Sequence, residues 1–398
     1  MRLRILRNRL ILLILSSVIL MSTSACWSPV ELNDRAFANL MLIDLTEDGQ
    51  FELTLGFPLA NRMIPGEVGG SGEKGQKPFA FVTKTGKSLP HALQDIQSDI
   101  SRDITFGQTR NIVISQKLAK RGLDPLLDFI SRHIAFHISA NLFITPGKAL
   151  EIVETPTTFE RFISILLRSY VEDKETIDTT LRDILRTRYK SEDILVPLLA
   201  FGKQPEITAK LEKAETWLGV DGAAILKKGR MINPTLSKED MKTSLWIDSN
   251  IKVMIINIES PTDGKEVSFN IENVKTKVQV KHKENVPSIH LQTRGTASIL
   301  ASDSKLDLKD DAQLIQLQKA LNQEMRNRIL RAINTTRTAQ ADVFHFKDYI
   351  DWKYPHVLQK ISSDWNEFYA KELEIESTVN VRIRSTGEAY KSIKEEST

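Results

Sequence analysis

The hydrophobic pattern of the first half of the chain predicts short strands alternating with helices. Residues 36–60 contain two apolar runs around the sequence TEDGQ, in which the pair Asp48-Gly49 is typical of a hairpin turn. Residues 61–78 are rich in glycine and proline and have no apolar period, which predicts a flexible loop. Beyond this loop, apolar runs of strand length alternate with amphipathic helical stretches.

The second half shows a period of two instead. In VKTKVQVKH, Val274, Val278 and Val280 fall on one face and lysines on the other, which predicts a sheet with one solvent-exposed face. A long helix is predicted over 310–336, and a last strand over 373–384. These patterns predict a multi-domain α+β protein of two to three domains, each a mostly antiparallel or mixed sheet packed with helices.

Changes in pattern also predict the domain boundaries. A chain of 398 residues is too long for a single hydrophobic core. We predict a leader over 1–25, an N-terminal α+β region over 26–210, a C-terminal α+β domain over 211–390 and a polar tail over 391–398. The division between the two large regions is placed where apolar periodicity fades.

The first 25 residues have the parts of a secretory signal peptide. Four arginines precede an apolar stretch over 10–21, and small residues follow it. As a helix this stretch reaches about 18 Å, well short of the roughly 30 Å hydrocarbon core of a bilayer. A cleaved signal is therefore favoured over a spanning helix.

Cys26 is the only cysteine, which excludes an internal disulfide and a zinc site built from several thiolates. The preceding Thr23, Ser24 and Ala25 resemble a bacterial lipobox, in which the cysteine sulfur takes a diacylglyceryl group and becomes the first residue. Thr23 departs from this pattern, because leucine is usual there. The alternative is an incidental cysteine near an uncleaved anchor. We predict lipidation of Cys26, because two acyl chains bury many CH₂ groups at about 0.8 kcal/mol each.

Composition and charge are those of folded, soluble domains, with 41% hydrophobic and 26% charged residues. The formal net charge is +3, but without the four leader arginines the chain has 50 basic and 51 acidic residues. Nucleic-acid binding needs a basic field that displaces counterions. Nucleic acid is therefore not expected as a partner.

The motifs that would indicate phosphate binding, metal binding or catalysis are incomplete. The sequence TGKSL at 85–89 resembles the end of a phosphate-binding loop, but Phe81 stands where that loop needs glycine. His133 and His137 have the spacing of two zinc ligands, but Ile134 replaces the glutamate of the protease motif. No nucleophile has a base at a sensible spacing. We therefore predict no enzyme, with no catalytic residue, metal or cofactor.

Four sequence blocks resemble one known family. ACWSPVELND is similar to the mature start of the Ger(x)C lipoproteins, the C subunits of GerA-type receptors for spore germinants, with Ser28 in place of the usual aspartate. The later blocks begin at TFGQTRNIVIS, GVDGAAILKKG and ADVFHFKDYID, with Gln108 where histidine is common and Asn233 at a usual glycine. The blocks follow the family order and cover nearly the whole mature chain.

The resemblance implies a non-enzymatic α+β protein of three domains, anchored through Cys26 on the outer surface of the spore inner membrane. It also implies assembly with the integral membrane A and B subunits of a nutrient receptor. Trp27, Glu31, Leu32 and Asn33 would emerge at the membrane. They either dock a partner or begin the packing of the first strand.

A second hypothesis is a lipid-anchored extracytoplasmic solute-binding protein. Such a protein needs a concave, partly aromatic pocket between two lobes built from βαβ units. The period-two strands of this sequence look antiparallel, which favours the receptor subunit. A secreted hydrolase, as a third class, would need a nucleophile that the sequence does not show.

Overall fold

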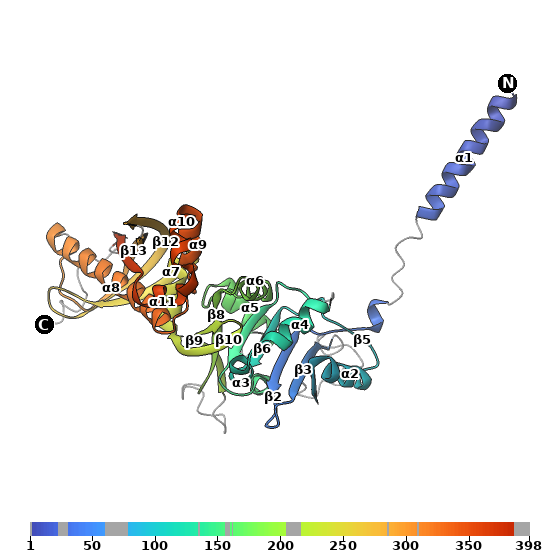
Figure 1. The fold of residues 1–398 in the computed structure, drawn as a ribbon, viewed down its shortest axis with the longest axis horizontal. Coiled ribbons are helices and arrows are strands. Elements are labelled where there is room, and N and C mark those ends of the chain that lie inside the picture. The colour runs from blue at the N-terminus through green and yellow to red at the C-terminus, as the bar shows by residue number, and fades with distance from the viewer. Residues whose placement is uncertain are drawn as a thin grey trace.

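Three sheets organise the part of the chain that the computed structural model describes (Figure 1). The described residues are 2–22, 31–59, 79–133, 136–155, 160, 162–203, 216–284, 286–308 and 310–385. Cys26, Trp27, the loop predicted over 61–78 and the tail predicted over 391–398 lie outside these residues. The mixed sheets and their packed helices confirm the prediction of a multi-domain α+β protein.

The large sheet has eight strands in the order β10-β9-β8-β7-β6-β2-β3-β4. Its strands are β2 (Leu40–Leu45), β3 (Phe51–Pro58), β4 (Phe79–Gly86), β6 (Asn111–Ser115), β7 (Asn141–Thr145), β8 (Asp193–Lys203), β9 (Thr216–Lys227) and β10 (Arg230–Ser237). The central pairs β2-β6, β6-β7 and β7-β8 are parallel, whereas the outer pairs are antiparallel. The large sheet is thus mixed, which agrees with the prediction of mostly antiparallel or mixed sheets. Strand β6 is buried on both faces, and its continuous apolar run is typical of a parallel strand covered by helices on both sides.

Helices cover both faces of the large sheet. They are α2 (Leu89–Asp99), α3 (Gln116–Arg121), α4 (Asp124–Arg132), η3 (Ala149–Glu154), α5 (Ile163–Glu172) and α6 (Leu181–Lys190). On β6, Ile112 and Ile114 pack with α2, α3, α4 and α6, whereas Val113 packs on the opposite side with η3 and α5. The hydroxyls of Ser88, Ser115 and Thr180 cap helices by accepting backbone N–H groups.

The small sheet has four strands in the order β11-β12-β13-β14. They are β11 (Val253–Glu259), β12 (Glu266–Lys283), β13 (Val286–Ser302) and β14 (Glu374–Ser385), and only the β13-β14 pair among these is parallel. The accompanying helices are α8 (Asp311–Thr338), α9 (Phe346–Lys353), α10 (Pro355–Ile361), η5 (Ser362–Asp364) and α11 (Trp365–Lys371). The apolar stripe of α8, which includes Leu317, Leu321 and Met325, is buried as the helical period predicted.

The N-terminal end of the described chain holds the remaining elements. Helix α1 covers Arg2–Ser22. The turn η1 (Leu32–Asp34) leads into β1 (Arg35–Phe37), which pairs in parallel with β5 (Asp103–Thr105). None of the helices in the described residues is long and apolar enough to cross a membrane.

A single helix, α7 (Lys238–Ile247), connects the large sheet to the small sheet, because it follows β10 and precedes β11. It packs against β9 and β10 of the large sheet, against β12 and β13 of the small sheet, and against α8. The side chains of Met241, Leu245 and Trp246 are at most 1% exposed. They belong to one apolar cluster that runs from Leu42 in β2 to Val381 in β14. We call α7 and its contacts the joint.

The predicted boundary between residues 210 and 211 falls in the connection between β8 and β9. These two strands pair from Asp193 opposite Lys227 to Lys203 opposite Thr216. The large sheet therefore crosses the predicted boundary and takes β9 and β10 from beyond it.

We expect Trp246→Ala to lower the free energy of unfolding by about 3 to 5 kcal/mol, because it opens a large cavity in the joint. Trp246 is 0% exposed. The indole Nε1 has no hydrogen-bond partner in the structure, so Trp246→Phe should cost much less than the alanine variant. Trp352→Ala is the control, since Trp352 is 87% exposed. Denaturant unfolding measures all three, and equal losses for Trp246→Ala and Trp352→Ala would contradict the central position of α7.

Candidate functional site

The predicted attachment segment begins the folded body. Glu31 and Asn33 are exposed, and Leu32 lies in η1. The backbone N–H of Asp34 donates to the carbonyl of Glu31 over 3.1 Å, which turns the chain into β1. The pairing of β1 with β5 begins at Arg35 opposite Asp103. The exposed side chains leave docking of a partner by this segment as a prediction.

The distance between Cys26 and the folded body is short. Nine peptide units separate Cys26 from Arg35 in the sequence. Fully extended, they span at most about 30 Å. A lipid on Cys26 would therefore hold β1 and its partner β5 close to the bilayer surface.

An apolar groove of about 770 Å³ lies beside β5, between α2 and α4. Its lining includes Phe51, Leu89, Leu93, Ile104, Phe106, Phe129 and His133. This volume is within the usual range for small-molecule sites. The groove is built on the N-terminal region alone, however, and not between two lobes as the solute-binding hypothesis required.

The two incomplete motifs have structural roles. Gly86 ends β4, where a Cβ atom would lie 2.7 Å from the backbone nitrogen of Ala92, so the close approach of α2 requires glycine. Ser88 caps α2 by accepting the backbone N–H of His91. The TGKSL sequence is therefore a strand-to-helix turn that caps its own helix.

The histidine pair does not share a helix face. Helix α4 ends at Arg132, and His133 is its C-cap. The His133 ring packs against Phe106, Phe129 and Phe136. Within the described ranges, no three His, Cys, Asp or Glu residues come close enough to hold a metal ion.

A polar cavity lies where β8 and β9 of the large sheet meet the segment between α8 and α9. The ammonium of Lys227 donates to the carbonyl of Gln340 over 2.7 Å. The Asp342 carboxylate accepts the backbone N–H groups of Phe346 at 3.0 Å and Lys347 at 2.9 Å. These contacts fix the start of α9 against the large sheet.

Two buried carboxyls in this cavity have raised pKa values. Burial raises the pKa of Asp193 from 3.8 to about 6, even though Lys227 and the backbone N–H of Asp342 favour its charged form. Burial likewise raises the pKa of Asp342 to about 7, and the neighbouring Asp193 charge adds to this rise. Burial also lowers the pKa of Lys227. Desolvation thus outweighs attraction at Asp193, Asp342 and Lys227.

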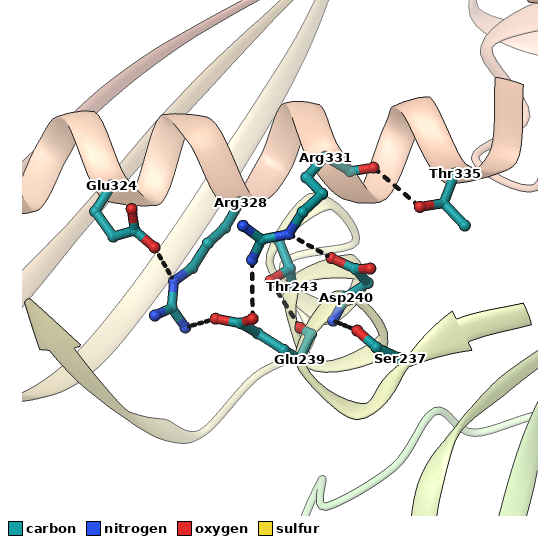
Figure 2. A network of polar contacts seen from close by, with 8 residues as sticks. All are labelled: Ser237, Glu239, Asp240, Thr243, Glu324, Arg328, Arg331 and Thr335. Carbon is teal, nitrogen blue, oxygen red and sulfur yellow. Dashed lines mark hydrogen bonds and ion pairs between the residues drawn. The ribbon is translucent and has the colours of Figure 1, made fainter. Parts of the chain in front are cut away.

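An ion-pair network fastens α7 to α8 at the joint (Figure 2). The Glu239 carboxylate bridges Arg328 and Arg331, with 2.9 Å between its Oε2 and Nη2 of Arg331. Arg331 also reaches Asp240 through Nε at 3.2 Å, and Arg328 reaches Glu324 at 2.7 Å. The Arg328 side chain is only 12% exposed, so its pairs are less screened than ordinary surface pairs.

The start of α7 is capped as well, because the Ser237 hydroxyl accepts the backbone N–H of Asp240 at 3.1 Å (Figure 2). The sequence did not indicate that this helix lies between the sheets. The same is true of the ion pairs, because Glu239 and Arg331 lie far apart in the sequence. The only sign of this network in the sequence is the pair of carboxylates, Glu239 and Asp240, in the first turn of α7.

The fold and its contacts define a class of protein. It has an α+β body in which a buried helix joins the large sheet to the small sheet, with an exposed segment at the N-terminal end. Two family models match it in order. "Spore germination protein N-terminal domain" matches residues 28–201, and "Spore germination B3/ GerAC like, C-terminal" matches residues 221–387. The chain belongs to the Ger(x)C family of spore germination proteins.

Similar proteins carry related names. The putative spore germination protein YfkR of Bacillus subtilis (strain 168) is 24% identical over 384 residues, covering 96% of this chain and 97% of the relative. Spore germination protein KC of the same organism is 26% identical over 393 residues, covering 95% of each. The crystal structure of the GerBC protein shares the fold, with a TM-score of 0.56 at 17% identity over 86% of this chain and 96% of the other. The chain thus has a role related to spore germination.

We expect Asp193→Asn to be more stable than the wild type at pH 8, by on the order of 2 kcal/mol, and to match it only below about pH 3.8. The folded pKa of about 6 lies above the unfolded value of 3.8. The contribution of this carboxyl to stability is therefore fully present below pH 3.8 and is lost as the pH rises through about 6.

Calorimetric melting of both proteins across this pH range measures the difference. Asp128→Asn is the control, because Asp128 is an exposed residue paired with Arg132. A stability difference between Asp193→Asn and wild type that does not change with pH would contradict the raised pKa.

Proposed function

We propose that this chain is a non-enzymatic, lipid-anchored subunit of a spore nutrient germinant receptor. It assembles with the integral membrane A and B subunits on the outer surface of the spore inner membrane and helps to trigger germination. The observation that carries the proposal is the order of features. A secretory leader and a lipobox-like cysteine stand directly before the two germination-family domains.

The proposed mechanism is positional. Acylation of Cys26 confines the protein to two dimensions and raises its effective concentration for membrane partners. The exposed Glu31 and Asn33 lie in the connection between lipid and body, where a membrane subunit would meet them first. The joint keeps the large and small sheets in one packed unit, so a contact at one end also orients the other.

A second candidate is a lipid-anchored extracytoplasmic solute-binding protein. The apolar groove between α2 and α4 is the observation that favours it, because its volume and aromatic lining suit a small ligand. Calorimetric titration of the full chain with amino acids and sugars separates the two candidates. Tight binding that Leu93→Arg abolishes supports the solute-binding protein, whereas absence of binding supports the receptor subunit.

We expect Cys26→Ala to abolish acylation and to lower both membrane retention and nutrient-triggered germination severalfold, because the second chain of a lipid pair turns reversible binding into stable anchoring. Membrane fractionation and the loss of optical density of germinating spores measure these effects. Thr23→Leu is the matched control, since it restores the usual lipobox leucine and should keep both properties. An unmodified Cys26 thiol in the native protein, seen by mass spectrometry, would contradict the proposal.

A further inference from the structure

The small sheet has an outer face that points away from its apolar core. Along β12 and β13, the inward positions Thr293 and Val280 are at most 3% exposed. On the opposite face, the side chains of Gln279 and Gln292 hydrogen-bond to each other across the two strands at 3.2 Å. We call the face that carries these glutamines the outer face.

Four cations gather on the outer face from three strands. Lys275 and Lys277 lie on β12, Arg294 on β13 and Arg382 on β14, and all four are exposed. Lys275 stands directly opposite Arg294 in the β12-β13 register. Arg294 is opposite Asn380, two residues before Arg382 on β14. The four side chains therefore form one basic cluster.

Within the part of the chain that the structure describes, no ion pair neutralises the basic cluster, although the carboxylates of Glu272 and Glu376 lie on the same face. None of its four cations makes an ion pair with another described residue. The nearby Glu272 carboxylate accepts a hydrogen bond from the Asn270 amide at 2.7 Å instead. Like charges directly opposite each other on neighbouring strands destabilise a sheet. The Lys275-Arg294 pair thus carries a cost that an anionic partner would remove.

Aliphatic side chains border the basic cluster on the same face. Val253 and Ile255 on β11 are 51% and 61% exposed. They stand opposite Glu272 and Asn270 of β12, whose side chains also point outward. Cations beside exposed aliphatic groups suit a surface that is anionic outside and apolar beneath.

We propose that the outer face of the small sheet binds the anionic phospholipid headgroups of the membrane to which the chain is tethered. The phosphates neutralise the basic cluster, and Val253 and Ile255 enter the interfacial layer. This inference rests on the proposed lipid anchor, which keeps the body beside one large anionic surface and so raises the local concentration of headgroups.

Two contacts with the membrane, one through the lipid anchor and one through the outer face, would orient the molecule. The small sheet lies at the opposite end of the folded body from β5, which pairs with the strand that follows the tether (Figure 1). With the joint holding the sheets together, contact at both ends lays the long axis of the body along the bilayer.

Lysine footprinting tests the inference on the full chain reconstituted in vesicles. The vesicles contain phosphatidylcholine alone, or phosphatidylcholine with about one third phosphatidylglycerol. An amine-reactive ester labels exposed lysines, and mass spectrometry gives the rate at each site. We expect Lys275 and Lys277 to react at least about threefold more slowly on the anionic vesicles, and high salt to remove this protection. Lys87 and Lys120, exposed on the N-terminal region, serve as internal references.

A charge-reversal variant gives the matched comparison. Arg294→Glu with Arg382→Glu should abolish the protection of Lys275 and Lys277, whereas Lys87→Glu with Lys120→Glu, the same change in net charge, should leave it intact. Both pairs are exposed, so folding is checked by equal melting temperatures.

Each other outcome counts against the inference. Equal reactivity of Lys275 and Lys277 on both vesicles, while the chain still floats with them, overturns the headgroup contact and leaves the lipid anchor standing. Protection that appears only after the integral membrane subunits are added assigns the face to a protein partner instead. A chain that floats with neither vesicle overturns both the anchor and the headgroup contact.

Discussion

Burial of α7 between the two sheets is the constraint on which the rest of the structure depends. The helix exposes almost none of Met241, Leu245 and Trp246, so a side chain of any other size there would leave a void or a clash. The apolar cluster around it reaches from the large sheet to the last strand of the small sheet. Glu239 and Arg331 then add polar contacts at the rim, where solvent reaches them (Figure 2). Packing therefore holds the two parts together, and the ion pairs fix their angle.

The joint keeps the large and small sheets in one packed unit. A body that is held at one end places its other end in a fixed position only if it does not bend between them. The polar cavity at the start of α9 contributes to this, because Lys227 ties the segment before α9 to the large sheet and the Asp342 carboxylate accepts the Phe346 N–H at the start of α9. The cost is the desolvation of Asp193, which Lys227 and the backbone N–H of Asp342 partly offset.

Local features were predictable from the sequence because they depend on near neighbours. The hairpin at Asp48-Gly49 and the long helix over 310–336 both follow from short-range chemistry and were found where expected. The order of the strands in the large sheet could not be predicted, since a fully buried strand such as β6 has no alternation that would indicate its neighbours. Nor could the joint, because the periodicity of α7 resembles that of any short amphipathic helix.

The basic cluster shows the same limit at a functional surface. The lysines of VKTKVQVKH were predictable as the wet face of a strand, and a solvated face needs no partner. Arg294 and Arg382 change that interpretation, because strand register brings them beside Lys275 from positions that the sequence keeps far apart. Four cations that make no ion pair with another described residue then share one face, and like charges on neighbouring strands repel each other. The proposed site therefore depends on the assembled sheet and not on any one stretch of the sequence.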